Sequence, residues 1–426
     1  MMPARRALRC LWPSDSRYFA RVRRVLKLPA YRRLLGAYTL NELAFSIGSV
    51  ALALLVYRRT GSALGATAFF LCSQFFPALV APMVVARLDR RAPREVLPSL
   101  YALEGVVFLA LAALVGRFSL APVLGLALLD GVIALTARSL ARTASVAVTS
   151  PAHLLREGNA LANTSFSICF MVGPALAGAV VAAGGTRVAL LGNSGLFALI
   201  ALTLLTASGL PGPMPDRSPV RGRVRAALSH ARERSPIRIL LGLQAAALLF
   251  FTISIPVEVV FAQHTLHAGA GGYGGLLAAW GGGAIAGSAV YARWRGLSAR
   301  TLIGLGAASM GVGLLVMAMA PSLAVAIVGA AVAGVGNGVE AVSARTALQE
   351  QVEQLWMALM MSLNESISQI VPGAGILLGG AITALAGTRT ALAVAGIGAL
   401  AITAASWVVL RPGALPSEPS RELTHA

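Results

Sequence analysis

The sequence predicts an all-α membrane protein with twelve transmembrane helices, arranged as two pseudo-symmetric six-helix bundles. An apolar composition, twelve apolar segments and an internal repeat predict this fold class. Hydrophobic residues make up 57% of the chain and charged residues 12%, against roughly 25% charged residues in an average soluble domain. A soluble fold of this size would expose large apolar patches to water, so we expect a lipid bilayer as its solvent.

The apolar segments define the order of the helices, since a span needs about 20 mostly apolar residues. Twelve segments qualify: 34–57, 63–87, 96–116, 120–147, 161–183, 188–209, 237–262, 270–294, 300–320, 322–348, 357–385 and 390–411. A long polar stretch rich in Pro and Arg separates the sixth from the seventh. The predicted parts are therefore a basic N-terminal segment 1–33, a first bundle 34–209, a linker 210–236, a second bundle 237–411 and a tail 412–426.

The distribution of charge assigns the sides of the membrane. The net charge is +19, but the basic residues lie in short segments between apolar runs and form no stripe on one folded domain, so we expect no nucleic-acid partner. Of the 35 basic residues, 30 fall in alternate loops, which include both termini and the linker, or in the adjoining halves of the helices. Basic loops stay in the cytoplasm. We expect a multi-pass protein of the cell inner (plasma) membrane with both termini cytoplasmic. All basic residues but Lys27 are Arg, which suggests a bacterial genome rich in G and C.

Short matches in the same order relate the two halves of the chain. Their offsets lie between 202 and 206 residues: Leu34-Leu35-Gly36 with Leu240-Leu241-Gly242, Ala86-Arg87 with Ala292-Arg293, Ala141-Arg142-Thr143 with Ala344-Arg345-Thr346, and Gly185-Thr186-Arg187 with Gly387-Thr388-Arg389. Because an even number of spans separates the halves, the repeats run parallel.

The loop after the second helix reads Val85-Ala86-Arg87-Leu88-Asp89-Arg90-Arg91-Ala92-Pro93-Arg94. It resembles the loop signature of the major facilitator superfamily at Asp89, Arg90 and Arg94, while both signature glycines and one basic position are absent. The resemblance implies a central cavity lined by helices 1, 4, 7 and 10. It also implies a cytoplasmic latch at Asp89, Arg90 and Arg94, and a carboxylate near a helix N-terminus is favourable there.

A second motif, Gly173-Pro174-Ala175-Leu176-Ala177-Gly178, lies in the fifth helix. It is similar to the glycine-proline signature of drug antiporters in that superfamily, with Cys169 where an upstream glycine is expected. Proline kinks a helix and small residues admit a neighbouring backbone, so Gly173, Pro174 and Gly178 form an expected helix-kink motif. The segment Thr60-Gly61-Ser62-Ala63 resembles the bacterial efflux branches for macrolides and siderophores.

Ionisable residues inside a bilayer need a partner or a purpose. Glu42 lies about 12 Å and Arg138 about 13 Å from the cytoplasmic ends of their helices, at 1.5 Å per residue, so the two are expected at one level. Arg142 follows Arg138 by one helical turn, and Asp130 precedes Arg138 by two helical turns. These residues either hold helices in register or form a proton relay, because a buried carboxylate can take up and release a proton.

Four further helices carry ionisable residues. We expect Glu258 and Glu340 to take part in coupling, and Glu365 to belong to the cytoplasmic latch. Glu104 is expected to be structural and to pair with loop arginines.

The residues favour proton-coupled export of an amphipathic small molecule, such as a drug or siderophore, by an antiport mechanism. Uptake of a nutrient and a non-transporting sensor or scaffold remain alternatives. We expect no enzyme activity, cofactor or metal: there is no phosphate-binding GxxxxGK[ST] loop, and His264 and His267 are a weak metal signal. The expected partners are the substrate, protons and the lipid bilayer, with the protein as a monomer.

Overall fold

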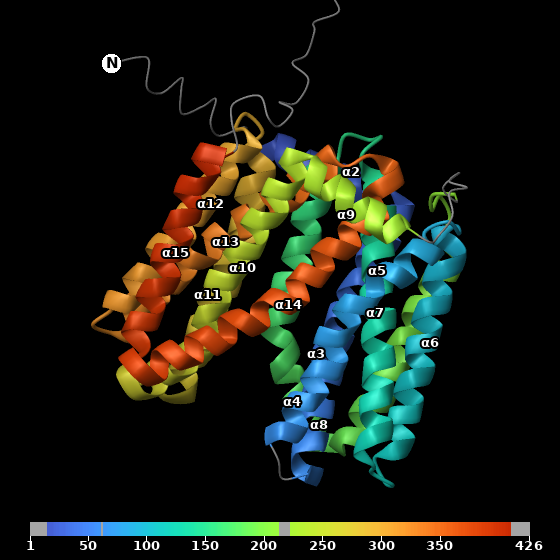
Figure 1. Cartoon of the computed structure of the whole chain (residues 1–426), viewed down its shortest axis with the longest axis horizontal. Coiled ribbons are helices and arrows are strands. Elements are labelled where there is room, and N and C mark those ends of the chain that lie inside the picture. The colour runs from blue at the N-terminus through green and yellow to red at the C-terminus, as the bar shows by residue number, and fades with distance from the viewer. Residues whose placement is uncertain (1–14, 61–62, 213–221, 410–426) are drawn as a thin grey trace, which may run out of the picture. The chain divides into compact units, whose positions relative to one another are not determined.

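The structure is a computed structural model that describes residues 15–60, 63–212 and 222–409 (Figure 1). The first 14 residues, Gly61, Ser62 and the tail 412–426 lie outside the described part, and with them part of the predicted terminal segments. All regular structure in the described residues is helical, as the sequence predicts.

The helices follow the predicted order. Before the linker they are α2 (Asp15–Lys27), α3 (Pro29–Thr60), α4 (Ala63–Phe70), the π-helix η1 (Leu71–Phe75), α5 (Phe76–Leu88), α6 (Pro93–Leu114), α7 (Leu120–Thr149) and α8 (Leu155–Leu205). After it they are α9 (Arg223–Glu233), α10 (Ser235–Val260), the π-helix η2 (Phe261–Thr265), α11 (Gly269–Arg293), α12 (Ala299–Met319), α13 (Leu323–Gln351), α14 (Gln354–Ala386) and α15 (Thr388–Val409). The helices α2 and α9 were not predicted. They lie within the basic N-terminal segment and the linker.

Eleven described helices are long and apolar enough to cross a membrane, and one of them, α8, holds two spans. Gly185 interrupts α8 with φ 77° and ψ 172°. Its repeat partner Gly387 ends α14 with φ 86° and ψ 168°. Only glycine adopts this backbone conformation readily, so the repeated Gly-Thr-Arg sequence marks the same turn in both halves. Dividing α8 at Gly185 gives the twelve predicted spans.

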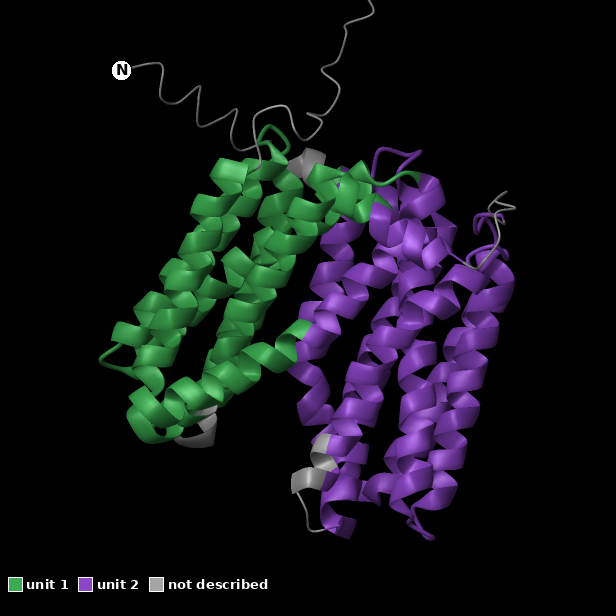
Figure 2. Cartoon of the chain, viewed as in Figure 1, with its two compact units in different colours: residues 1–20, 230–353, 371–426 green, residues 21–229, 354–370 purple. Residues whose placement is uncertain are grey.

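The described chain forms two compact units (Figure 2), and each is described by itself. Of the described residues, unit 1 comprises 15–20, 230–353 and 371–409, and unit 2 comprises those between 21 and 229 and 354–370. The boundary therefore falls inside α14. Its first half packs with helices of the first repeat, and its second half belongs to unit 1.

The same helix pairs pack in both units. In unit 2, α7 packs against α5 and α6, and α6 packs against α8. In unit 1, α13 packs against α11 and α12, and α12 packs against α15. These pairs correspond one to one in chain order, which agrees with the duplication inferred from the sequence.

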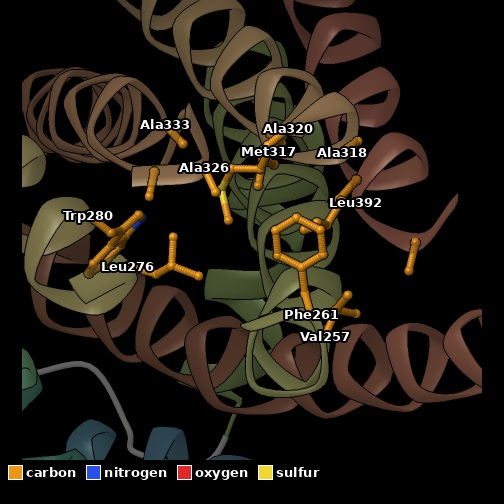
Figure 3. Packing of buried hydrophobic residues seen from close by; sticks show 14 of the residues in the cluster. Val257, Phe261, Leu276, Trp280, Met317, Ala318, Ala320, Ala326, Ala333 and Leu392 are labelled. Carbon is orange, nitrogen blue, oxygen red and sulfur yellow. The ribbon is translucent and has the colours of Figure 1, made fainter. Parts of the chain in front are cut away.

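Unit 1 is held by an apolar cluster and by close helix contacts. Phe261 and Val257 are fully buried among Leu276, Leu392 and small residues of α12 and α13 (Figure 3). Trp280 stacks on Phe251 with ring centroids 5.3 Å apart. Small residues let backbones approach closely, which drives helix association in membranes.

Gly338 is one of the contacts between α13 and α11. A Cβ atom at this position would overlap the carbonyl oxygen of Ala284, which belongs to the backbone and cannot move by a side-chain rotation. We expect Gly338→Ala to lower the free energy of unfolding by about 1–3 kcal/mol, the usual cost of overpacking. Thermal unfolding of the purified protein measures this loss.

Gly178 in α8 supplies the matched control, because no atom lies within 4 Å of a Cβ built there. Alanine favours a helix over glycine by about 1 kcal/mol, so Gly178→Ala should keep or raise the unfolding temperature. Equal losses at both positions would contradict the packing account.

Candidate functional site

The α7 charge cluster consists of Glu42, Arg138, Arg142 and Glu365. Arg138 and Glu42, expected at one depth in the membrane, lie in contact: Nη2 of Arg138 lies 3.3 Å from Oε1 of Glu42, and both side chains are buried. Arg138 also faces the ring of Phe45, 5.4 Å from its centroid. The matching depths of the two residues in α3 and α7 thus produce an interhelical contact.

Glu365, on the first half of α14, completes this cluster. Its carboxylate lies 3.8 Å from Nη1 of Arg138 and 2.6 Å from Nε of Arg142. The guanidinium of Arg142 also lies 5.8 Å from the ring centroid of Tyr38. Two carboxylates and two guanidinium groups therefore neutralise one another, as buried charges require. The cluster attaches Glu365 of α14 to α7, a partnership that the sequence did not indicate.

A pocket in unit 2 lies next to this cluster. Only a small part of the space between its lining atoms is wide enough for water-sized groups, and part of it is open to the surroundings. Four phenylalanine rings and several polar side chains face it. The lining residues are Asn41, Phe45, Gly48, Ser49, Leu52, Phe69, Ser73, Phe108, Ala127, Asp130, Gly131, Ala134, Leu135, Arg138, Phe197 and Gln369.

Two polar atoms in the pocket wall have no hydrogen-bond partner among the described residues. Oδ1 of Asp130 and Oγ of Ser73 are buried and form no hydrogen bond with a described residue. Ser73 belongs to η1, and π-helical turns inside α-helices are frequent at functional sites. Most buried polar atoms in folded proteins are hydrogen-bonded, so orphaned ones need an explanation. A proton or a ligand at this place would provide it.

The structure contradicts the prediction that Glu104 of α6 pairs with loop arginines. Its side chain is fully buried, and neither carboxylate oxygen has a hydrogen-bond partner in the described residues. It pairs with no loop arginine among the described residues. The reason is depth: Glu104 follows Pro93 by eleven residues, about 16 Å along the helix. Arg138 and Asp130 are near enough to act on it electrostatically.

Unit 1 holds the other two predicted coupling residues. Glu258 is buried in α10 and accepts a hydrogen bond from Oγ of Ser254, one turn earlier, at 3.1 Å. Glu340 is buried in α13, where Oε1 has no hydrogen-bond partner in the described residues. The described pocket includes neither residue, so their roles remain predictions.

Asp89 forms a bidentate ion pair with Arg223, the first residue of α9. The oxygen atoms lie 2.8 and 3.0 Å from the two terminal nitrogens of the guanidinium. Arg223 also donates to the carbonyl of Ala86 at 3.2 Å. Both charged side chains are almost fully buried. Arg223 was not a predicted site residue; the basic linker is the signal that points toward it.

The other predicted latch residues behave differently. Arg94 forms an ion pair with the adjacent Glu95 at 3.7 Å, and both are exposed. Two guanidinium nitrogens of Arg90 are buried without a hydrogen-bond partner in the described chain. Only Asp89 among the three therefore forms a described buried ion pair.

The predicted helix-kink motif divides into two faces. Gly173 is buried where a Cβ would overlap the side chain of Ser46 in α3. Pro174 and Gly178 are exposed on α8. The interruption of α8 lies at Gly185, beyond the motif. Gly173 thus allows close approach of α3 and α8.

Solved structures support the fold. The E. coli fucose:proton symporter FucP (N162A) shares 14% identity with a TM-score of 0.69, covering 90% of this chain and 98% of its own. The human organic anion transporter MFSD10 shares 17% identity with a TM-score of 0.69, and the match covers 90% of this chain and 99% of MFSD10. A bacterial homologue of the iron transporter ferroportin, in an outward-facing state, shares 17% identity with a TM-score of 0.67, covering 89% and 99%. No curated protein matches the sequence significantly.

The family comparison covers nearly the whole chain. Residues 31–424 match the major facilitator family described as transmembrane secretion effector. Together with the helical architecture and the two repeats, this match makes the protein a multi-pass membrane protein with a transporter fold. The chain belongs to the transmembrane secretion effector family of the major facilitator superfamily.

Proposed function

We propose that this protein is a secondary active transporter that exports amphipathic small molecules in exchange for protons by alternating access. The observation that carries the proposal is the pocket of unit 2 beside the α7 charge cluster. Asp130, whose Oδ1 atom has no hydrogen-bond partner in the described residues, lines this pocket together with four phenylalanines. Aromatic walls suit the apolar part of a substrate, and a few polar groups fix its orientation.

Protons are the proposed coupling ion because of the carboxylates. Charged groups within spans are costly and mark ion pathways in transporters. Asp130 has a buried oxygen without a hydrogen-bond partner in the described residues, so protonation would remove an uncompensated charge. Glu42, Glu258 and Glu340 are the other candidates for the coupling residue.

The first half of α14 is the proposed moving element. Glu365 connects it to α7, Oγ of Ser366 donates to the carbonyl of Ala78 at 2.6 Å, and Ile370 packs on Leu135. Breaking the pairs of Glu365 would release this segment from α5 and α7. In this proposal the cluster alternates between a state with these pairs made and a state with them broken, as a conformational switch requires.

Transport by purified protein in proteoliposomes tests the proposal. The vesicles would be loaded with a panel of amphipathic compounds and assayed with and without an imposed pH gradient. We expect at least one compound to accumulate against its gradient only when protons flow in the opposite direction. Equilibration of every transported compound, with no response to the pH gradient, would refute proton coupling.

Uptake is the second candidate direction. The structural similarity to a fucose:proton symporter and to the nucleoside transporter NupG (14% identity, TM-score 0.58) favours it. The direction of proton movement separates the two: export requires exchange, whereas proton-driven uptake requires movement in the same direction.

We further propose that the protein is a monomer in the cell inner membrane with both termini in the cytoplasm. Single cysteines at the exposed positions Arg117 and His267 should react with an impermeant thiol reagent added outside intact cells. Cysteines at the exposed positions Arg91 and Arg225 should react only after permeabilisation. The pattern follows from the basic loops remaining inside. Labelling of position 225 in intact cells would contradict this topology.

The pair of Asp89 and Arg223 is proposed to act as a latch between the end of α5 and the linker helix α9. Asp89→Asn should slow turnover several-fold while the substrate concentration for half-maximal transport changes little. The reason is that the pair lies outside the described pocket. Initial-rate transport measurements check both values.

Arg94→Gln is the matched control for this latch. Arg94 belongs to an exposed ion pair, and such pairs contribute about 0–1 kcal/mol, so its turnover should stay close to wild type. A large loss of affinity in Asp89→Asn with normal turnover would refute the latch.

A further inference from the structure

We infer that unit 1 binds an anionic phospholipid where α12 begins and α15 ends, with Arg300 as the partner of the lipid phosphate and Trp407 beside it. Arg300 and Trp407 are called the α12–α15 lipid site below. The inference goes beyond the proposed function, because it concerns the lateral surface of unit 1 and the lipid around it.

The α12–α15 lipid site is built by two helices that pack against each other (Figure 1). A terminal guanidinium nitrogen of Arg300 donates to the carbonyl of Trp407, and the guanidinium lies 5.3 Å from the centroid of the Trp407 ring. The indole also lies against Gly304, one helical turn after Arg300, where a Cβ atom would overlap it. A cation and an aromatic ring are therefore held together at one end of the helix pair.

The charge of Arg300 is not neutralised by a described residue. Its hydrogen bond and its ring contact are both made to Trp407, which is neutral, and its Nε atom has no hydrogen-bond partner in the described chain. The segment 293–300 contains three arginines and no acidic residue. A guanidinium has five N–H donors that suit phosphate oxygens, so an anionic group at this place would supply both the missing charge and the missing acceptors.

Arg389, at the other end of the same helix pair, differs from Arg300 in its bonding. Its Nη1 atom donates to the carbonyl of Ala318 at 2.7 Å, and its Nη2 atom donates to the carbonyl of Ala320 at 2.8 Å. Both terminal nitrogens of Arg389 thus join α15 to the end of α12. Arg300 makes one such bond within the described residues, which leaves most of its donors for a ligand.

The surface next to the α12–α15 lipid site is apolar and exposed. One face of α15 carries exposed residues at helical spacing, and these are Ile397, Ala401, Ala404 and Val408. Leu305 is exposed on α12, and Trp407 itself is 47% exposed. Exposed apolar residues on a membrane-spanning helix contact acyl chains, and tryptophan is enriched at the level of the headgroups. A ligand with a phosphate at one end and acyl chains along the helices is a phospholipid.

The charge of Arg300 favours an anionic lipid over a zwitterionic one. In a zwitterionic headgroup an ammonium group already neutralises the phosphate, whereas an anionic headgroup carries a net charge opposite to that of Arg300. In the topology proposed above, this end of the helices lies at the cytoplasmic leaflet, whose anionic lipids attract basic residues close to the membrane. The α12–α15 lipid site should therefore prefer headgroups with a net negative charge.

Quenching of Trp407 fluorescence by brominated lipids tests this inference, because bromine quenches tryptophan at short range. The reporter protein retains Trp407 and carries the substitutions Trp12→Phe, Trp280→Phe, Trp294→Phe and Trp356→Phe. It is reconstituted in phosphatidylcholine bilayers that contain equal fractions of either brominated phosphatidylglycerol or brominated phosphatidylcholine. Phosphatidylglycerol should bind beside Trp407 about fivefold more strongly, the effect of one basic residue near a membrane surface. Equal quenching by the two lipids would overturn the inference.

Variants of the reporter protein assign the preference to Arg300. Arg300→Gln should remove it, and Arg300→Lys should keep most of it because the charge remains. Arg225→Gln, which removes an exposed arginine of α9, should behave like the unchanged reporter. A preference that survives in Arg300→Gln, or that is lost in Arg225→Gln, would contradict a site at Arg300. Thermal unfolding shows whether each variant is folded, and the emission of wild-type protein minus that of Trp407→Phe gives the same signal without the other substitutions.

A soluble phosphate is the competing ligand for the same chemistry. Replacing NaCl in the buffer with sodium phosphate of equal ionic strength should leave the preference for phosphatidylglycerol unchanged. Loss of the preference in phosphate buffer would show a site for free phosphate and overturn the assignment to lipid. The quenching assay involves no transport, so its result does not depend on whether the protein exports substrates.

Discussion

Replacing Arg138 with methionine should lower the free energy of unfolding by about 3–5 kcal/mol, the usual cost of leaving a buried charge unpaired. Arg138 is the described ion-pair partner of Glu42, whereas Glu365 also contacts Arg142. The substitution therefore leaves Glu42 buried without a counter-charge. Thermal unfolding in detergent should show a clear decrease, and less folded protein should be recovered.

The double variant Glu42→Gln with Arg138→Met is the control. It removes both members of the pair, and Glu365 keeps Arg142, so most of the lost stability should return. Removing both partners of a buried pair is often close to neutral. If Arg138→Met alone were as stable as wild type, or if the double variant were no better than the single one, the charge cluster would not stabilise unit 2 as proposed.

Neutralising Asp130 should have the largest effect on transport. Asp130→Asn should abolish accumulation driven by a pH gradient, because asparagine cannot carry the coupling proton. Downhill exchange at saturating substrate should persist, since the pocket and the α7 charge cluster remain. Proteoliposome assays with and without the gradient measure both modes.

Glu104→Gln is a matched control for folding. Neither Glu104 nor Asp130 has a described ion-pair partner, so neither substitution leaves an arginine unpaired, and both variants should retain the wild-type unfolding temperature. Gradient-driven transport that persists in single neutralisations of Asp130, Glu42, Glu258 and Glu340 would rule out coupling through these carboxylates.

The fold was predictable because the bilayer constrains it. Span length and loop charge depend only on local composition, and they gave the order of the helices. The Glu42–Arg138 pair was predictable for a related reason: a fixed rise per residue converts sequence position into depth. The sequence shows the Gly-Thr-Arg repeat that contains Gly185. Only the structure shows the backbone conformation at Gly185, which explains why both copies of the repeat have glycine there.

Contacts that depend on how a helix is rotated or divided were not predictable. Glu365 joins Arg138 and Arg142 because the first half of α14 packs in unit 2, and composition carries no sign of that division. Arg223 is one of seven basic residues between Arg217 and Arg238, and nothing in the sequence distinguishes it as the partner of Asp89. Glu104 was assigned a loop partner from its charge alone, although its depth in α6 prevents one.

The most direct test of proton-coupled transport reverses the coupling. Proteoliposomes would contain a pH-sensitive dye and receive a concentration gradient of the panel compound that exchanges fastest, with no initial pH difference. By linkage, downhill movement of substrate should drive protons in the opposite direction and shift the internal pH. Wild-type protein should produce this shift, and Asp130→Asn should not. Downhill transport by wild-type protein without any change in internal pH would contradict the account.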